Sequence, residues 1–351
     1  MIREMEMNKN KTPDEVFLAM ENPDFDLWGF INEKGEWVIG SKFLFVEDFA
    51  ENGLAVAGDA NLDLKGFINK KGEWVIEPKY YGTLDNFSNG LAAASLPEYK
   101  NMNFIDDNFD GYINEKDEVV IEPRFIGADP FTENGLACVW DGETELFGFI
   151  NTKGEWVVAP QYSWAESFAK NGLAAVKDVQ TKLWGYINEK GELAIEFQYL
   201  AAECFSSSKV AAVKDKTSKL WGYITETGEW LIKPKYLKSW PFGTNDIAEV
   251  KDRRTKLWGF INKKGEWIIK PLFSEVGSFS ENGLAPAEDA QTRLWGYINL
   301  KGEWVIEPKY CYASSFENGF AEIGAGKLRK MGYIDEEGKQ IDVQKFAWPG
   351  I

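Results

Sequence analysis

A glycine recurs along this chain at an almost constant interval, inside a string that usually reads Trp-Gly-aromatic-Ile-Asn. Six of the eight intervals are 37 residues, one is 45 and one is 36; the nine glycines are Gly29, Gly66, Gly111, Gly148, Gly185, Gly222, Gly259, Gly296 and Gly332. A fixed period of this length is typical of repeat proteins, in which each unit packs mainly on its neighbours. We therefore expect about nine copies of one structural unit.

Each unit contains three short apolar runs separated by turn residues, as in 173–178, 183–188 and 192–196. This pattern predicts three antiparallel strands. The second turn reads Asn-x-Lys-Gly, as at Asn188 to Gly191, which suits a type I turn closed by a G1 bulge. Both faces of the strands carry apolar residues, so we expect each small sheet to be sandwiched between its neighbours. A phenylalanine in every connector, such as Phe205, is expected to plug the space between adjacent units.

The predicted fold is all-β: about nine antiparallel units of ~37 residues in an open, superhelical, solenoid-like array. The alternative is a closed β-propeller of about eight blades. Thr12-Pro13-Asp14-Glu15 resembles a capping box, which predicts a short helix through Met20. The expected organisation is an N-terminal segment with this capping helix at 1–22, the β array at 23–346, and a C-terminal tail at 347–351.

The charge balance limits the partners that this chain can bind. The net charge of -17 argues against general nucleic-acid binding, and no apolar run approaches the length of a membrane span. Three cysteines, each at a different place in its repeat, suit reduced thiols, so we expect a cytoplasmic protein. Residues 1–200 contain 36 acidic and 17 basic side chains, whereas residues 201–351 contain 20 acidic and 22 basic ones.

The sequence offers little for catalysis. It has no histidine, no cysteine pair with zinc spacing and no Gly-rich phosphate loop. The obvious glutamates occupy one recurring position after the turn glycine, which indicates a structural role. We therefore expect a protein that is not an enzyme and needs no cofactor.

One metal site remains a hypothesis. The long third interval contains Asp106, Asn108 and Asp110, followed by Asp117, at the spacing of a calcium-binding loop. The alternative is a solvated polar loop. Phe104 and Ile105, in the same insertion at 99–110, are candidate contacts for a protein partner.

The main candidates for partner binding lie in the later units, at about 180–300. Trp184, Trp221, Trp258 and Trp295 recur at one position and, if exposed, would form a ladder for sugars, peptide or protein. The alternative is that these rings pack between units. Lys251, Arg253 and Arg254 lie in the most basic stretch, and Trp140, Trp164 and Trp240 stand outside the repeat pattern.

The string W-G-[YF]-I-N-x-K-G-E-W-V-I-x-P-K-Y resembles the bacterial WG-repeat (KWG-repeat) family over about residues 24–346. Lys65, Asp110, Phe147 and Met331 depart from the family's tryptophan. The resemblance implies a bacterial protein with a role in binding or assembly, and its variable repeat number favours an open array. It supplies no catalytic residues. We expect a non-enzymatic scaffold that presents a long surface to another protein or to itself; the alternative is a carbohydrate- or peptide-binding module.

Overall fold

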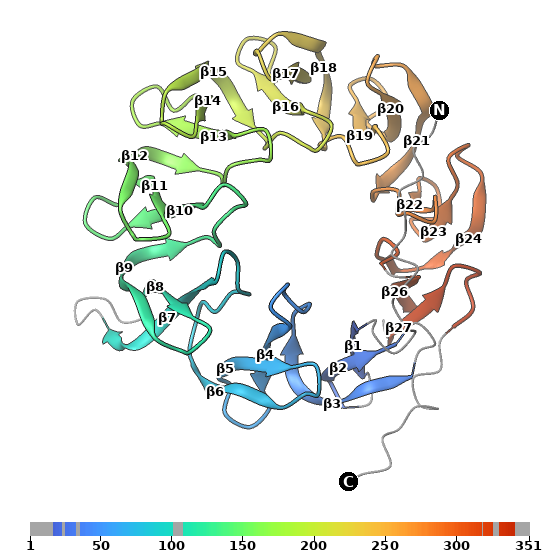
Figure 1. Ribbon diagram of the computed structural model, residues 1–351. Coiled ribbons are helices and arrows are strands. Elements are labelled where there is room, and N and C mark those ends of the chain that lie inside the picture. The colour runs from blue at the N-terminus through green and yellow to red at the C-terminus, as the bar shows by residue number, and fades with distance from the viewer. Residues whose placement is uncertain are drawn as a thin grey trace, which may run out of the picture.

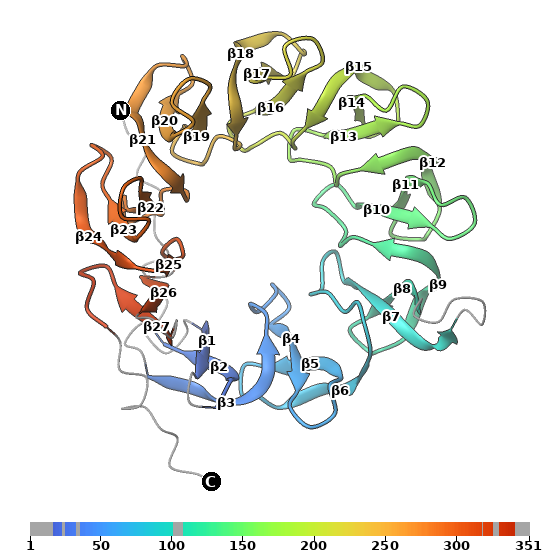
Figure 2. The same cartoon turned by 180° about the vertical axis from the view of Figure 1, so that it is seen from behind.

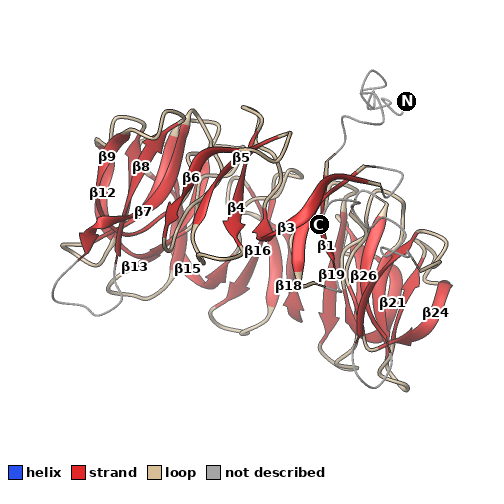
Figure 3. Cartoon of the chain, turned by 90° about the horizontal axis from the view of Figure 1, so that it is seen from below, coloured by secondary structure: helices blue, strands red, loops and turns tan. Residues whose placement is uncertain are grey.

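The computed structural model describes residues 17–22, 25–32, 36–100, 108–317, 319–325 and 330–340. These residues form strands and turns, and none of them is helical. No helix in this part of the chain is long and apolar enough to cross a membrane. The strands build nine successive units arranged around a central axis, with the first and last units side by side (Figures 1 and 2). Figure 3 shows the array from below.

The first four units comprise β1 (Leu18–Asn22), β2 (Leu27–Ile31), β3 (Trp37–Val46); β4 (Leu54–Asp59), β5 (Lys65–Asn69), β6 (Trp74–Tyr80); β7 (Leu91–Lys100), β8 (Asn108–Asn114), β9 (Val119–Ala128); β10 (Leu136–Asp141), β11 (Phe147–Asn151) and β12 (Trp156–Ala165). The next three are β13 (Leu173–Asp178), β14 (Trp184–Asn188), β15 (Leu193–Ala202); β16 (Val210–Asp215), β17 (Trp221–Thr225), β18 (Trp230–Ser239); β19 (Ile247–Asp252), β20 (Trp258–Asn262) and β21 (Trp267–Val276). Unit 8 contains β22 (Ala285–Asp289), β23 (Trp295–Ile298), β24 (Trp304–Tyr310) and β25 (Tyr312–Ala313), and unit 9 contains β26 (Phe320–Ala325) and β27 (Lys330–Asp335).

The third strand of a unit is shared between two units. In β15, Ile195 pairs with β14 of its own unit, whereas Ala202 pairs with β16 of the next unit. Tyr199, between them, pairs with both neighbouring strands. Register shifts at this point change the strand's partner. Strand pairing therefore runs continuously from β7 to β24 and joins units 3 to 8.

The glycine of the Trp-Gly pair is needed for a close backbone approach. A Cβ atom on Gly185 would lie 2.6 Å from the carbonyl oxygen of Ile195 on β15, and the equivalent glycines of units 1 to 4 and 6 to 8 face the equivalent carbonyl. The register between β14 and β15 shifts at this point. Because any side chain would force these strands apart, the glycine recurs wherever the unit recurs.

The turn between the second and third strands confirms the predicted type I turn with a G1 bulge. Gly191 has a φ of 78° and donates its N–H to the carbonyl of Asn188 over 2.9 Å. The Asn188 side chain accepts N–H groups of Lys190 and Glu192 and donates to the Glu192 carboxylate. Asp117, with a φ of 66°, takes the glycine position in unit 3. The recurring glutamate is therefore part of the turn.

Phe205 illustrates how units pack. Its ring lies 4.9 Å from that of Tyr186, in a buried cluster that also contains Ala211 and Ile224 of the next unit. The prediction that the connector phenylalanine fills the space between adjacent units is confirmed. A second contact is made by the third strand: Trp230 meets the Tyr199 ring of the preceding unit edge-on at 5.9 Å.

Two expectations about the strands are wrong. Residues Leu18–Asn22 form β1, paired with β2, so the predicted helix does not extend through Met20; its start at Thr12 lies outside the described residues. Pairing with β2 supplies the hydrogen bonds that a helix would have made locally. The third strand is also not buried on both faces. Ile306 packs on Gly338 of the next unit, whereas Val305, on the opposite face, is 50% exposed.

The array of antiparallel units is confirmed, with open sheets. No strand pairing joins the last unit to the first among the described strands, because β1–β6 and β25–β27 form separate sheets. Side chains make the contact instead: Met20 and Ile31 pack with Phe320 and Tyr333. The array has nine units, and its two ends meet without backbone pairing. It therefore differs from the eight-bladed closed propeller that was the alternative prediction.

Candidate functional site

The four tryptophans of the predicted ladder are not an exposed row. Trp258 is 2% exposed, and Trp184, Trp221 and Trp295 are partly buried against the clusters between units. Each ring shares a strand face with the aromatic residue two positions later, which is fully buried. The repeat therefore uses this tryptophan for packing.

Two of the exposed aromatic rings stand outside the repeat pattern. Trp164 and Trp240 are 49% and 50% exposed. Trp240 stacks on Trp258 with ring centroids 6.4 Å apart, and Trp164 lies 5.2 Å from Phe147. Phe147 in turn stacks on Trp140. Departure from the pattern marks these rings in the sequence but does not predict their exposure, because Trp140 also departs from it and its indole nitrogen is buried.

The three predicted basic residues divide into two groups. Lys251 lies on β19, with its ammonium 5.5 Å from the Trp258 ring centroid and 3.4 Å from a Glu275 carboxylate oxygen. Arg253 and Arg254 are exposed in the loop between β19 and β20. Figure 1 shows these loops between first and second strands on the outer rim of the array. Lys251 therefore contacts side chains of the two following strands, whereas the two arginines are exposed.

An aspartate holds each outer-rim loop in the later units. Asp252 accepts the N–H groups of Arg254 and Thr255 and the Thr255 hydroxyl, at 2.8–3.0 Å. These hydrogen bonds to its charged form lower the pKa of Asp252, against the effect of burial, which is the largest single influence and raises it. Asp178, Asp215 and Asp289 cap their loops in the same way.

The other charges of these loops change sign along the array. The loops of units 2 and 4 carry the acidic side chains Asp63, Glu143 and Glu145. The loops of units 5 to 8 carry the basic side chains Lys182, Lys216, Lys219, Arg253, Arg254, Lys256 and Arg293. All of these side chains come from residues that are exposed. The outer rim therefore has an acidic part and a basic part.

The described residues of the candidate calcium loop do not lie together as a set of metal ligands. Asn108 and Asp110 lie in β8, paired with both neighbouring strands, and Asp110 accepts a 2.5 Å hydrogen bond from the Ser95 hydroxyl. Asp117 instead contacts Lys79 and Tyr80 of the preceding unit. Strand pairing separates these groups, and no cluster of metal-binding side chains is found among the described residues. Phe104, Ile105 and Asp106 lie outside them.

Connectors between units line the inner rim and bond to one another. Asn134 donates to the carboxylate of Glu189, over 3.0 Å. Lys170 pairs with Glu133 of the preceding connector at 2.6 Å, and Lys263 pairs with Asp246 at 2.7 Å. The sequence does not reveal this arrangement, because the partners are 17 to 55 residues apart.

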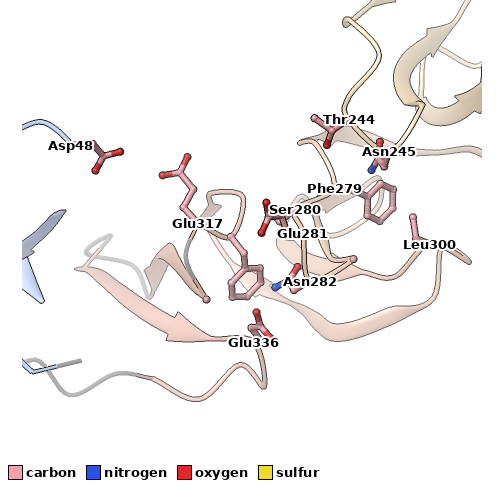
Figure 4. Close-up of a pocket in the computed structure, with 13 residues that line it drawn as sticks. Asp48, Thr244, Asn245, Phe279, Ser280, Glu281, Asn282, Leu300, Glu317 and Glu336 are labelled. Atoms are coloured by element: carbon pink, nitrogen blue, oxygen red, sulfur yellow. The ribbon is translucent and has the colours of Figure 1, made fainter. Parts of the chain in front are cut away.

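A cavity of about 710 Å³ opens on this inner rim where the array ends meet (Figure 4). Connectors of units 1, 6, 7 and 8 contribute to its lining, which includes Asp48, Phe279, Glu281, Glu317 and Glu336. No lysine or arginine is among the described residues that line it. In Figure 4, Glu317 extends between Asp48 on one side and the turn at Ser280 to Asn282 on the other.

A second cavity of about 310 Å³ shares Asp48 and Glu317 with the first. It adds Glu322 and Tyr333 of unit 9. Burial, followed by the nearby Glu21 carboxylate, raises the pKa of Glu322 above its usual range. The two cavities are therefore neighbours at the junction of the first and last units and share two carboxylates.

Nine like units in tandem, with units 3 to 8 joined by shared strands, define a tandem β-repeat protein. The chain belongs to the family described as WG containing repeat, whose model matches residues 28–57, 66–96, 111–139, 147–178, 184–216, 221–253, 258–289 and 295–323. These matches correspond to units 1 to 8. The later part of unit 9 lies beyond the last match.

One solved structure shows a similar fold at very low sequence identity, and two others give lower TM-scores. The crystal structure of the eukaryotic initiation factor has a TM-score of 0.63 to this chain at 10% identity, and the match covers 92% of this chain and 94% of that one. The dihydro-heme d1 dehydrogenase NirN reaches 0.49 at 8% identity, with 84% and 74% covered. Hsv2 of Kluyveromyces lactis reaches 0.42 at 9% identity, with 82% and 95% covered. No curated protein matches this sequence.

Proposed function

We propose that this chain is a non-enzymatic scaffold that binds another protein, or a second copy of itself, through its outer rim. The observation that carries the proposal is the change of charge along equivalent loops. Their basic residues lie in four successive units, so they form one strip that an acidic surface can follow. Charge complementarity of this kind selects partners and accelerates their encounter.

The loop conformation favours binding. Each basic loop is closed by the aspartate that precedes it, as Asp252 closes the loop of unit 7, while Arg253 and Arg254 are exposed residues. A partner therefore meets a backbone that is already ordered, and less conformational freedom is lost on association. The acidic outer rim of units 2 and 4 offers the matching surface if the partner is a second copy.

The test is a pull-down from native lysate with tagged wild-type chain and with a Lys216→Glu, Arg253→Glu, Arg254→Glu variant. We expect the variant to lose the protein that wild type retains, and we expect high salt to release that protein from wild type. Sedimentation of the purified chain separates self-association from capture of another protein.

The matched control carries the same change in charge at exposed turn residues, as Lys116→Glu, Lys153→Glu, Lys190→Glu. It is expected to retain the partner. Equal loss in both variants would mean that total charge, and not the basic strip, controls binding. Equal retention of the partner by both variants would show that the basic strip of the outer rim does not bind it.

The second candidate function is carbohydrate or peptide binding, and the exposed rings of Trp164 and Trp240 favour it. Each forms part of a surface stack with a neighbouring ring, to which a sugar face or a proline can add. Intrinsic tryptophan fluorescence during titration with a glycan panel tests this function. A Trp164→Ala, Trp240→Ala variant that responds like wild type would contradict it.

A further inference from the structure

We propose that Trp240 is the aromatic anchor of the outer-rim interface, and that the partner meets it with an acidic segment that carries an aromatic side chain. This inference rests on the proposed function, because it names the chemistry of the partner that the basic strip would bind. Trp240 differs from the equivalent residues of the preceding units and from Trp164, the other exposed ring outside the repeat pattern. Both differences favour a partner of this kind.

Trp240 occupies a position that carries a carboxylate at each of the five preceding junctions. At every one of these junctions the residue donates its backbone N–H to the third residue of the next first strand, as Trp240 does to Glu249. The five equivalents are Glu47, Asp85, Asp129, Glu166 and Glu203. The sixth junction thus keeps the backbone contact but presents an indole ring in place of a negative charge. The carboxyl group of Glu249 does not restore that charge at the surface, because this residue is buried.

The Trp240 ring is supported from below and remains half exposed. It stacks on Trp258 with ring centroids 6.4 Å apart and planes only 10° from parallel. Trp258 is 2% exposed and forms the base of the stack, whereas Trp240 is 50% exposed. A ring that is already held in place loses little conformational freedom on binding, and tryptophan is among the side chains most enriched at interface hot spots.

Positive charge lies beside this stack. The ammonium of Lys251 is 5.5 Å from the Trp258 ring centroid, and Lys238 is paired directly opposite Lys251 across the two strands. Like charges in such a cross-strand pair repel each other. Glu275 neutralises Lys251, whereas Lys238 is exposed and takes part in no ion pair within the described part of the chain. A carboxylate from a partner would supply the counter-charge that Lys238 lacks.

Trp164 shows the opposite surroundings. Its ring is 49% exposed, but its indole N–H donates to a carboxylate oxygen of Glu166 over 2.8 Å. The outer-rim loop of its unit carries Glu143 and Glu145, whereas the loop that leads into Trp258 carries Arg253, Arg254 and Lys256. An acidic segment is therefore attracted towards Trp240 and repelled from Trp164.

An aromatic side chain in the partner would extend the existing stack. Trp240 and Trp258 already lie ring on ring, and aromatic pairs contribute more than the burial of their area alone. Carboxylates on either side of the partner's ring would then reach Lys238 and the loop arginines. The need for both a ring and acidic groups distinguishes this partner from a neutral glycan and from a purely acidic chain.

The test is calorimetric titration of the full chain, at constant ionic strength, with three blocked peptides. Their sequences are Glu-Glu-Trp-Glu-Glu, Glu-Glu-Ala-Glu-Glu and Lys-Lys-Trp-Lys-Lys. We expect the first peptide to bind with 1:1 stoichiometry, the second to bind at least ten-fold more weakly, and the basic peptide not to bind. Equal affinity for the two acidic peptides, preference for the basic peptide, or binding of none of the three overturns the proposal.

Three variants locate the site. Trp240→Ala should reduce the affinity for the tryptophan peptide to that for the alanine peptide and leave the latter unchanged. The matched control Trp164→Ala, at the other exposed ring, should bind both acidic peptides like wild type. Lys238→Gln should weaken both acidic peptides. If Trp240→Ala and Trp164→Ala have the same effect, the ring of Trp240 is not the anchor.

A pull-down with Trp240→Ala separates this inference from the proposed function. We expect Trp240→Ala to lose the protein that the Lys216→Glu, Arg253→Glu, Arg254→Glu variant also loses. If Trp240→Ala retains that protein while the charge variant loses it, the anchor is wrong and the outer-rim interface stands. If both variants retain it, the outer-rim interface fails as well.

Discussion

Glu249 gives the sharpest prediction for stability. It lies on β19 at the position that Ala175 and Ala212 occupy in the two preceding units, and it is 3% exposed. Burial raises the pKa of Glu249 from 4.5 to about 7, against weaker opposing hydrogen bonds from its own backbone N–H and from Ser278. The folded chain therefore holds this proton more tightly than the unfolded chain does.

The direction in which stability changes with pH follows from this difference in pKa between the folded and unfolded states. Both states are protonated well below pH 4.5, so no ionisation penalty exists there. As the pH rises from 4.5 through 7, the unfolded state loses its proton first, and the folded state becomes less stable relative to it. A pKa difference of about 2.5 units at about 1.4 kcal/mol per unit corresponds to about 3 kcal/mol above pH 8.

Glu249→Gln keeps the size of the side chain and removes its ionisation. We expect the stability of the variant relative to wild type to increase by about 3 kcal/mol between pH 4 and pH 8. Urea unfolding followed by circular dichroism at both pH values measures this change, because any fixed cost of the amide cancels in the comparison. The exposed control Glu229→Gln should show no such change. A difference between Glu249→Gln and wild type that is constant with pH would refute the reasoning.

Three further substitutions test the repeat itself, each by urea unfolding. Gly185→Ala should cost at least about 2 kcal/mol because its Cβ meets the Ile195 carbonyl, whereas Gly127→Ala, with open space around the Cβ, should be nearly neutral; similar costs would contradict the close-approach argument. Asn188→Ala removes the turn hydrogen bonds and should cost about 1–3 kcal/mol; no loss would mean that the glycine alone holds the turn. Phe205→Ala should cost about 3–5 kcal/mol by leaving a cavity between units, and a cost below 1 kcal/mol would show that the connector collapses to fill it.

The sequence predicted the repeating unit because its structure depends on short-range chemistry. Asn188 and Gly191 form a turn from residues within four positions of each other, and the spacing of the glycines follows from one close contact per unit. The connector phenylalanine was predictable because one large apolar residue recurs where the chain passes between units. The N-terminal helix was mispredicted because pairing of β1 with β2 outweighed a local capping pattern.

The sequence did not indicate where the aromatic and charged side chains face. Trp258 and Trp240 have the same chemistry, yet one is buried and the other exposed, because the bent third strand decides which ring the next unit covers. Glu281 and Asp48 are 233 positions apart and line one cavity only because the array curves until its ends meet.

The sequence alone therefore determined the unit, its three strands, its turns and the number of copies, since each depends on contacts within about 37 residues. Only the tertiary structure decided the two rims, the exposed stacks and the acidic cavity. These features depend on the rotation from each unit to the next, and a small rotation repeated over nine units fixes which distant connectors come together.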